Sequence, residues 1–233
     1  TSGTLTQNVD TPSNVFATLN SIYKAAYQSS FTNGNLTATT AGAGNYYPCF
    51  STFGVETGKW YAEFKPGAGD FHIGISSQSD TDNSFNVNDR YIGETSKSVG
   101  IANANGSYYI SGSATSYGTS YSDTNIIGVA LDMTNKKLYV SKDGTFYNSG
   151  NPASGSNGID ISGILSSGDN AFFAFTNYRG SGTGSCDVNF GSGFFGTTAV
   201  ASANADGNGF GAFEYAVPSG YFALCTKNIK EFG

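Results

Sequence analysis

IIGVALDMTNKKLYVSKDG, residues 126–144, is the stretch that decides the fold. Its first part, Ile126–Leu131, is a continuous apolar run of the kind expected for a strand buried on both faces. A turn of five residues separates this run from a second strand-like segment, Lys137–Ser141. The dipeptide Asp143-Gly144 that follows is a hairpin signal. The stretch therefore predicts neighbouring strands joined by short turns.

Alternating apolar residues elsewhere in the chain predict further strands. Lys59–Lys65 (KWYAEFK) and Asp70–Ser76 (DFHIGIS) each place every second residue on one face. The residues predicted to share these apolar faces are Trp60, Ala62, Phe64, Phe71, Ile73 and Ile75. His72 falls on the opposite face of its strand. The other predicted strands are Phe31–Thr39 (a pair with a turn at Asn33-Gly34), Tyr108–Ile110, Ala171–Asn177, Asp187–Phe190 and Tyr221–Cys225.

Length and composition fit one all-β domain. β-Sandwiches commonly reach the 233 residues of this chain as a single domain. The 32 glycines are spread throughout, and clusters of Gly, Ser, Asn and Asp separate short apolar runs. We predict a two-sheet antiparallel β-sandwich over residues 30–233, preceded by a flank over residues 1–29. Within the flank, Ser13–Gln28 has apolar residues at helical spacing, and a helix and an irregular segment fit this pattern equally.

Charge and hydrophobicity exclude two classes of partner, nucleic acids and membranes. The formal net charge is −6 and the basic residues are scattered, so the chain lacks the electrostatic footprint of a protein that binds nucleic acid. No run of eighteen apolar residues is present, so we predict no insertion into a membrane. Only 12% of the residues are charged, which predicts a surface of neutral hydroxyl and amide groups.

Cysteines and oxygen ligands give no clear metal signal. Cys49, Cys186 and Cys225 are odd in number and widely spaced, which predicts buried free thiols and leaves one disulfide bridge open. Asp80–Asp89 is the densest group of oxygen ligands, and calcium binds six to eight such oxygens. The segment lacks the glycine and the closing glutamate of an EF-hand loop. A solvated acidic loop is therefore preferred over a calcium site, and we predict no metal and no cofactor.

Catalytic candidates are few. His72 is the single histidine, and a structural, hydrogen-bonded role fits it better than that of a catalytic base. Glycosidases need two carboxylates that face one groove, and no predicted strand carries two acidic residues on one face. Glu63, Asp132 and Glu214 each stand alone. We predict no catalytic residues and no enzyme activity.

Six segments together resemble SPRY domains in order and spacing, over about residues 30–226. They are Gly58–Phe64 (GKWYAEF), Phe71–Ile75 (FHIGI), Gly128–Asp132 (GVALD), Leu138–Gly144 (LYVSKDG), Phe172–Phe175 (FFAF) and Asp187–Gly191 (DVNFG). One departure is Asp143, which stands where the family commonly has Asn. The resemblance implies a concanavalin A-like jelly roll that binds partners through loops at one end of the sandwich and catalyses nothing.

The flanks resemble the segments that frame SPRY domains in structural proteins of tailed phages and environmental viruses. These segments are Asp10–Asn20 (DTPSNVFATLN) and Pro218–Asn228 (PSGYFALCTKN). The resemblance implies a virion component, such as a tail fibre, spike or capsid decoration, on the surface of the particle. The stretch Gly191–Phe213 is longer than in compact members of the family. It is a candidate for packing against a neighbouring subunit, and a second copy of the same chain in a homo-oligomer is one such subunit.

Aromatic residues make up 15% of the chain, and several tyrosines lie in or beside predicted loops. Tyrosines among Asn and Ser residues are typical of surfaces that bind sugars or proteins, although they also pack loops onto a sandwich. Arginine is favoured at contact hot spots, and each of the two chosen below adjoins such a tyrosine. The predicted ligand contacts are Arg90, Tyr91, Tyr108, Tyr117, Tyr121 and Arg179. The same loop-side group also includes Tyr46, Tyr47, Tyr109 and Tyr178.

The leading functional hypothesis is a non-enzymatic binding module of a virion that recognises a host surface glycan or protein through loops at the end of the sandwich. The alternative is a decoration or cement protein of a capsid or filament that binds only neighbouring virion subunits. Neither hypothesis requires a cofactor, a nucleic acid or a membrane.

Overall fold

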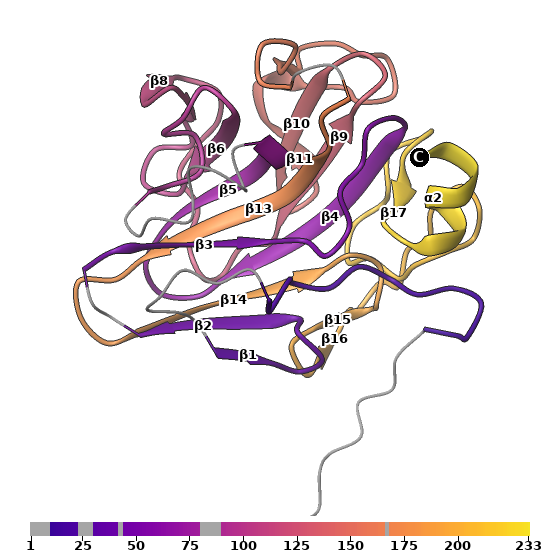
Figure 1. Cartoon of the computed structure of the whole chain (residues 1–233), viewed down its shortest axis with the longest axis horizontal. Helices are drawn as coiled ribbons and strands as arrows, with labels where there is room; N and C mark the ends of the chain where they lie inside the picture. Colours follow the sequence, from indigo (N-terminus) through magenta and orange to yellow (C-terminus); the bar gives the residue numbers. More distant parts are fainter. Residues whose placement is uncertain (1–9, 23–29, 42–43, 80–89, 166–167) are drawn as a thin grey trace, which may run out of the picture.

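The chain folds into two antiparallel sheets that pack face to face (Figure 1). This computed structural model describes residues 10–22, 30–41, 44–79, 90–165 and 168–233. The first sheet has the order β1-β2-β14-β4-β9-β10-β11, with β12 beside β10 and β17 beside β4. Its strands are β1 (Ser30–Thr32), β2 (Thr37–Ala41), β4 (Lys59–Pro66), β9 (Ile127–Asp132), β10 (Lys137–Lys142), β11 (Thr145–Phe146), β12 (Ile159–Asp160), β14 (Thr183–Asn189) and β17 (Phe222–Ala223).

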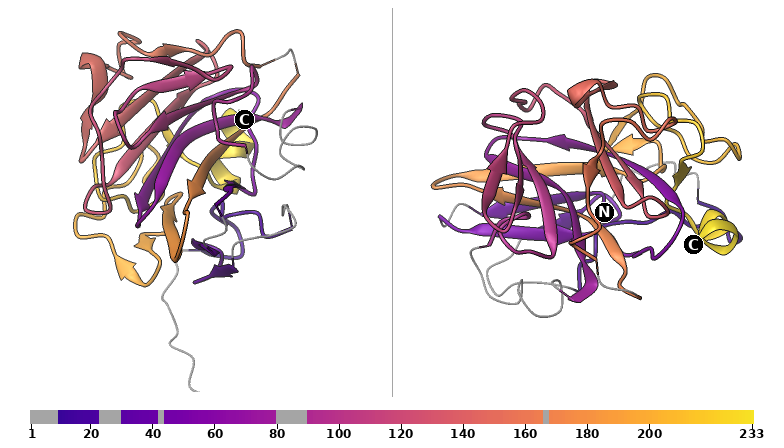
Figure 2. Two further views of the ribbon diagram at one scale, coloured as in Figure 1. Left: turned by 90° about the vertical axis from the view of Figure 1, so that its left-hand side faces the viewer. Right: turned by 90° about the horizontal axis from the view of Figure 1, so that it is seen from above.

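The second sheet has the order β3-β13-β5-β6-β7-β8. Its strands are β3 (Tyr46–Phe50), β5 (Asp70–Ser77), β6 (Ser98–Ala102), β7 (Tyr108–Ile110), β8 (Ser113–Thr115) and β13 (Ala171–Tyr178). A two-stranded ribbon, β15 (Phe194–Phe195) with β16 (Thr198–Ala199), and two short helices, η1 (Tyr147–Ser149) and α2 (Thr226–Phe232), complete the described elements. The layering of the sheets can be followed from two further sides in Figure 2. The all-β sandwich predicted from the sequence is confirmed.

The main core lies between the two sheets. The apolar faces predicted for β4 and β5 both point into it, and all six of their alternating residues are buried there. β9 pairs with β4 on one side and with β10 on the other, which explains its continuous apolar sequence. β10 turns into β11 through Asp143 (φ 49°) and Gly144 (φ 78°), as the hairpin signal predicted. The pair β1–β2 about Asn33-Gly34 is also confirmed.

The N-terminal flank is not helical where the structure describes it. Residues 10–22 form no helix, and isolated bridges join Phe16 to Cys225 and Leu19 to Ser51. The helical interpretation is therefore wrong for residues 13–22, and residues 23–28 lie outside the described part. Its apolar residues do not share one face, because Phe16 and Leu19 are buried while Val15 is 42% and Ile22 is 92% exposed. Tertiary contacts with different elements outweigh the local spacing.

The C-terminal part differs from the sequence-based expectation. α2 was not predicted, and Phe232 within it stacks on Phe222 of β17 with ring centroids 4.0 Å apart. The stretch 191–213 contains β15, β16 and an isolated bridge between Asn204 and Phe213, so it is folded onto its own chain. The stretch 201–211 between these elements remains a loop of bends and turns.

Three further observations concern the cysteines, membranes and metals. All three cysteines are buried and free, so the prediction of buried thiols is confirmed. Among the described residues, no helix is long and apolar enough to cross a bilayer. The same residues contain no group of three or more His, Cys, Asp or Glu side chains that could hold a metal ion. The acidic segment Asp80–Asp89 lies outside the described residues.

Candidate functional site: an aromatic face on the six-stranded sheet

The outer face of the six-stranded sheet carries a patch of aromatic side chains. In an antiparallel sheet, residues that pair directly point to the same side. Tyr178 of β13 pairs with Tyr46, the first residue of β3, and with Asp70, the first residue of β5. His72 lies opposite the apolar face of β5, so it points outward as predicted. The strand order thus gathers rings from distant parts of the sequence.

Five rings form one connected cluster, which we call the aromatic face: Tyr46, His72, Tyr91, Tyr109 and Tyr178. The His72 ring centroid lies 4.4 Å from that of Tyr91 and 5.0 Å from that of Tyr109. Tyr46 continues the cluster, 5.3 Å from Tyr91 and 5.0 Å from Tyr178. The four tyrosines are half-buried, so they expose ring surface while their neighbours restrict their rotation.

A short segment over the sheet positions Tyr91. Ile92 is fully buried against the outer face, and its backbone N–H donates to Thr176 Oγ1 at 3.2 Å. The next N–H, that of Gly93, donates to Ser98 Oγ at 2.9 Å. Gly100 makes this close approach possible, because a Cβ there would lie 2.3 Å from the carbonyl oxygen of Ile92. Tyr91 is thereby fixed beside His72.

His72 is electrically neutral at pH 7. Burial lowers the pKa of its imidazole to about 4, although a hydrogen bond to the backbone of Ile92 favours the charged form. The neutral ring carries one N–H donor and one lone-pair acceptor. The side chain is only 9% exposed, and Nδ1 has no hydrogen-bond partner within the described residues. A buried polar atom without a partner is costly, so Nδ1 is an unsatisfied group beneath the exposed rings.

Arg179 and a shallow hollow lie at one edge of the aromatic face. The hollow has a volume of about 280 Å³ and is lined by Gly69, Asp70, Tyr178, Arg179, Gly180 and Ser181. The carbonyl of Arg179 accepts a hydrogen bond from Gly44 N–H at 3.0 Å, which ties this edge to the start of β3. Figure 1 shows the β13–β14 connection and the start of β3 at the same end of the sandwich. Arg90, next to Tyr91 in the sequence, forms a long ion pair with Glu94 (3.7 Å).

Three of the six predicted contact residues belong to this region: Arg90, Tyr91 and Arg179. Tyr108 and Tyr117 lie elsewhere and contact each other, with ring centroids 5.9 Å apart. Tyr117 is only 8% exposed and borders another hollow, of about 390 Å³, together with Lys142. Burial raises its hydroxyl pKa.

The expectation of an exposed side chain is wrong for Tyr117 and Tyr121. Tyr121 is 5% exposed, and its hydroxyl donates to the carbonyl oxygen of Ile101 at 2.9 Å. Both tyrosines pack loops against the main core, which was the other interpretation of the loop tyrosines. The sequence did not single out Tyr46, Tyr109, Tyr178 or His72 as contacts. The signal for Tyr178 was its position beside Arg179.

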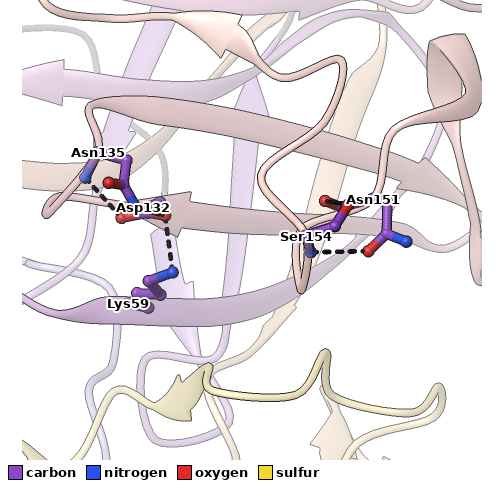
Figure 3. A network of polar contacts seen from close by, with 5 residues as sticks. All are labelled: Lys59, Asp132, Asn135, Asn151 and Ser154. Carbon is purple, nitrogen blue, oxygen red and sulfur yellow. Dashed lines mark hydrogen bonds and ion pairs between the residues drawn. The ribbon is translucent and has the colours of Figure 1, made fainter.

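The three carboxylates considered for catalysis have structural contacts. Glu63 is fully buried, and its oxygens accept hydrogen bonds from the backbone N–H groups of Glu214 and Tyr215, both at 2.9 Å. Figure 3 shows Asp132 bonded to Asn135 and to Lys59, whose Nζ lies 3.0 Å from a carboxylate oxygen. These contacts, with burial opposing them, lower the pKa of Asp132. Neither buried carboxylate faces an open groove.

A comparison with solved structures identifies a similar fold. The SPRY domain of human HERC1 matches with a TM-score of 0.52 and 16% sequence identity, over 69% of this chain and 91% of that one. The fold is SPRY-like. At this identity the likeness concerns the fold alone, and it confirms the concanavalin A-like sandwich expected from the sequence motifs. No family model and no curated protein matches the chain.

Proposed function

We propose that this domain is a non-catalytic binding module that holds a carbohydrate ligand on the aromatic face. The observation that carries the proposal is the group of half-exposed tyrosine rings that their ring neighbours hold in place on one face of the sheet. Aromatic rings offer flat apolar surfaces at low entropic cost, and sugar rings present matching C–H faces. The tyrosine hydroxyl groups would then orient hydroxyl groups of the sugar.

A carbohydrate fits these features better than a protein surface does. Protein interfaces are usually centred on a well-packed apolar anchor, whereas this face mixes ring surface with polar edges. The chain as a whole is rich in neutral hydroxyl and amide side chains, which exchange hydrogen bonds readily with sugars. The resemblance of the flanks to viral framing segments supports a host surface glycan as the source, with the domain displayed on a virion. A decoration role, with neighbouring virion subunits as partners, is the alternative.

A glycan array tests the proposal. Fluorescently labelled domain should bind a defined subset of immobilised oligosaccharides, and soluble sugar should compete. Tyr91→Ala should weaken binding by tenfold or more, since truncation of a hot-spot tyrosine costs about 2 kcal/mol or more and about 1.4 kcal/mol is a factor of ten. Tyr215→Ala is the matched control, because this half-buried tyrosine lies near Gly144, outside the aromatic face. Absence of binding to any glycan, or equal loss in both variants, would reject the aromatic face as a sugar site.

A further inference from the structure

The 233-residue chain has two arginines, and each is next in sequence to a tyrosine of the aromatic face. Arg90 adjoins Tyr91 in sequence, and Arg179 adjoins Tyr178. Ring contacts connect these two tyrosines through Tyr46, over steps of 5.3 and 5.0 Å between centroids. In an acidic protein of net charge −6, each arginine thus adjoins in sequence a tyrosine of the same aromatic surface. Such an arrangement suits an extended ligand that carries negative charge.

Arg179 is the stronger of the two anion-binding candidates. Its Nε is buried, yet it has no hydrogen-bond partner within the described residues. No ion pair joins this guanidinium to a carboxylate in the same part of the chain. A buried donor on a charged group is costly to leave unpaired, and guanidinium groups bind carboxylates and sulfates through parallel N–H donors. The hollow beside Arg179 gives such a group access.

Arg90 can supply a second contact. Its ion pair with Glu94 is long, at 3.7 Å, and both side chains are about a third exposed (40% and 32%). Ion pairs of this kind contribute little to stability, so the guanidinium can exchange Glu94 for a ligand anion at small cost.

Asp70 restricts the class of anion that the hollow beside Arg179 can bind. It lines the same hollow as Arg179, so the hollow presents a carboxylate as well as a guanidinium. A bare anion would be repelled by Asp70, whereas a hydroxylated acid can place its anion on Arg179 and donate a hydroxyl proton to Asp70. A sugar acid has both groups on one ring.

We propose that the ligand is an acidic oligosaccharide, with a carboxylate or sulfate bound by Arg179 and the adjoining sugar rings stacked on the aromatic face. This inference rests on the proposed carbohydrate binding and specifies its substrate class. It assigns the recognition of charge to Arg179 and the recognition of ring shape to the tyrosines.

Matched ligand pairs separate the two roles. Sialyllactose and tri-galacturonate would each be compared with their uncharged methyl esters by calorimetry, together with a sulfated disaccharide. The wild type should bind at least one free acid or sulfate tenfold to a hundredfold more tightly than the corresponding neutral sugar, as expected for charge-assisted hydrogen bonds. This preference should shrink as salt is raised.

Variants then assign the preference to a residue. Arg179→Gln should abolish the preference for the acid and leave the affinity for the methyl ester within about twofold, whereas Lys230→Gln on α2 should change neither. Arg90→Gln should reduce the preference partly, and it provides a second readout if Arg179→Gln lowers the melting temperature strongly. Equal binding of acid and ester overturns the acidic-ligand inference but leaves carbohydrate binding intact. Binding of inorganic sulfate alone, with no sugar bound, overturns both proposals.

Discussion

The two outer faces of the sandwich both carry aromatic rings, but the part of the chain that the structure describes closes only one of them. On the nine-stranded sheet, the N-terminal flank and the C-terminal segment cover the outward rings and form a second buried cluster: Phe16, Tyr61, Ala130, Tyr139, Phe213, Tyr221, Ala223 and Cys225. On the six-stranded sheet, the segment that contains Ile92 covers only part of the surface. The remaining rings make up the half-exposed aromatic face.

One buried polar side chain on each face shows a different set of hydrogen bonds, although the closed face also holds hydroxyl groups, those of Tyr139 and Tyr221, that are unpartnered within the described part of the chain. Glu63, on the closed face, accepts hydrogen bonds from Glu214, Tyr215, Asn189 and Tyr61. His72, on the open face, retains an unpartnered Nδ1 among the described residues. A buried carboxylate surrounded by donors is a structural anchor. The open face is distinguished by the half-exposed rings around His72, which leave surface for a ligand. The comparison separates stability from binding, and each prediction below tests one side of it.

The largest effect is expected from removing the anchor. Glu63→Ala leaves two backbone N–H groups and the Asn189 amide without their acceptor, so we expect a loss of about 3–5 kcal/mol in unfolding free energy. Glu63→Gln keeps one acceptor oxygen and should lose less. Urea denaturation measures both. A loss below about 1 kcal/mol for Glu63→Ala would show that Glu63 does not anchor the C-terminal segment.

The next effect is a pair of opposite pH dependences. Burial raises the pKa of Glu63 from 4.5 to about 7, although its donors favour the charged form. The folded state therefore keeps a proton that the unfolded chain releases, and stability falls as the pH rises from 4.5 to 7. Burial lowers the pKa of His72 from 6.5 to about 4, so the unfolded chain takes up a proton first, and stability falls as the pH drops from 6.5 to 4.

Between pH 4.5 and 6.5 the Glu63 and His72 contributions to the unfolding free energy change in opposite directions. Variants that remove one of the two groups separate these contributions. Relative to the wild type, His72→Gln should gain about 3 kcal/mol as the pH falls from 6.5 to 4, and Glu63→Gln should gain about as much as the pH rises from 4.5 to 7. Denaturation curves at half-unit pH steps measure the differences, since other groups contribute equally to each pair. A flat difference for either variant would mean that the group titrates at its ordinary pKa.

The sequence predicted the parts of the fold whose local signals agree with their tertiary environment. Alternation in β4 and β5 matched their inward faces, and the apolar run in β9 matched burial between two neighbours. β3 was missed because Pro48 interrupts its pattern, and an edge strand tolerates proline since one side needs no donor. The flank was misread as potentially helical because its apolar residues contact separate elements.

The candidate site was only partly predictable, because strand pairing assembles it. β13 lies between β3 and β5 in the sheet, although it follows both in the sequence, and this order brings Tyr178 beside Tyr46. No local pattern contains that information. Tyr121 shows the converse error, since a tyrosine among polar residues resembles a surface residue while its hydroxyl bonds within the core.

A smaller stability effect is expected on the open face. Tyr91→Ala removes a half-exposed ring, so the loss in unfolding free energy should be about 1 kcal/mol, well below that of Glu63→Ala. The same variant should lose tenfold or more in sugar affinity. Thermal denaturation and glycan binding on one sample give both values. A stability loss as large as that of Glu63→Ala would identify Tyr91 as a structural residue and remove the distinction between the two faces.

The smallest effect concerns the ion pair at the edge of the open face. Glu94→Gln removes the partner charge of Arg90 but keeps an oxygen that can accept from the Tyr91 N–H. Because the pair is long and partly exposed, the unfolding free energy should change by less than about 0.5 kcal/mol. Affinity for the acidic sugar should rise about twofold for two reasons. Arg90 no longer has to leave the Glu94 carboxylate to bind the ligand, and the negative charge of Glu94 no longer repels the ligand anion. Unchanged affinity in this variant, with Arg179→Gln showing no preference for the acid over the ester, would confine anion recognition to Arg179. A drop in affinity would mean instead that Glu94 orients Arg90 for the ligand, so that even this exposed pair is part of the binding face.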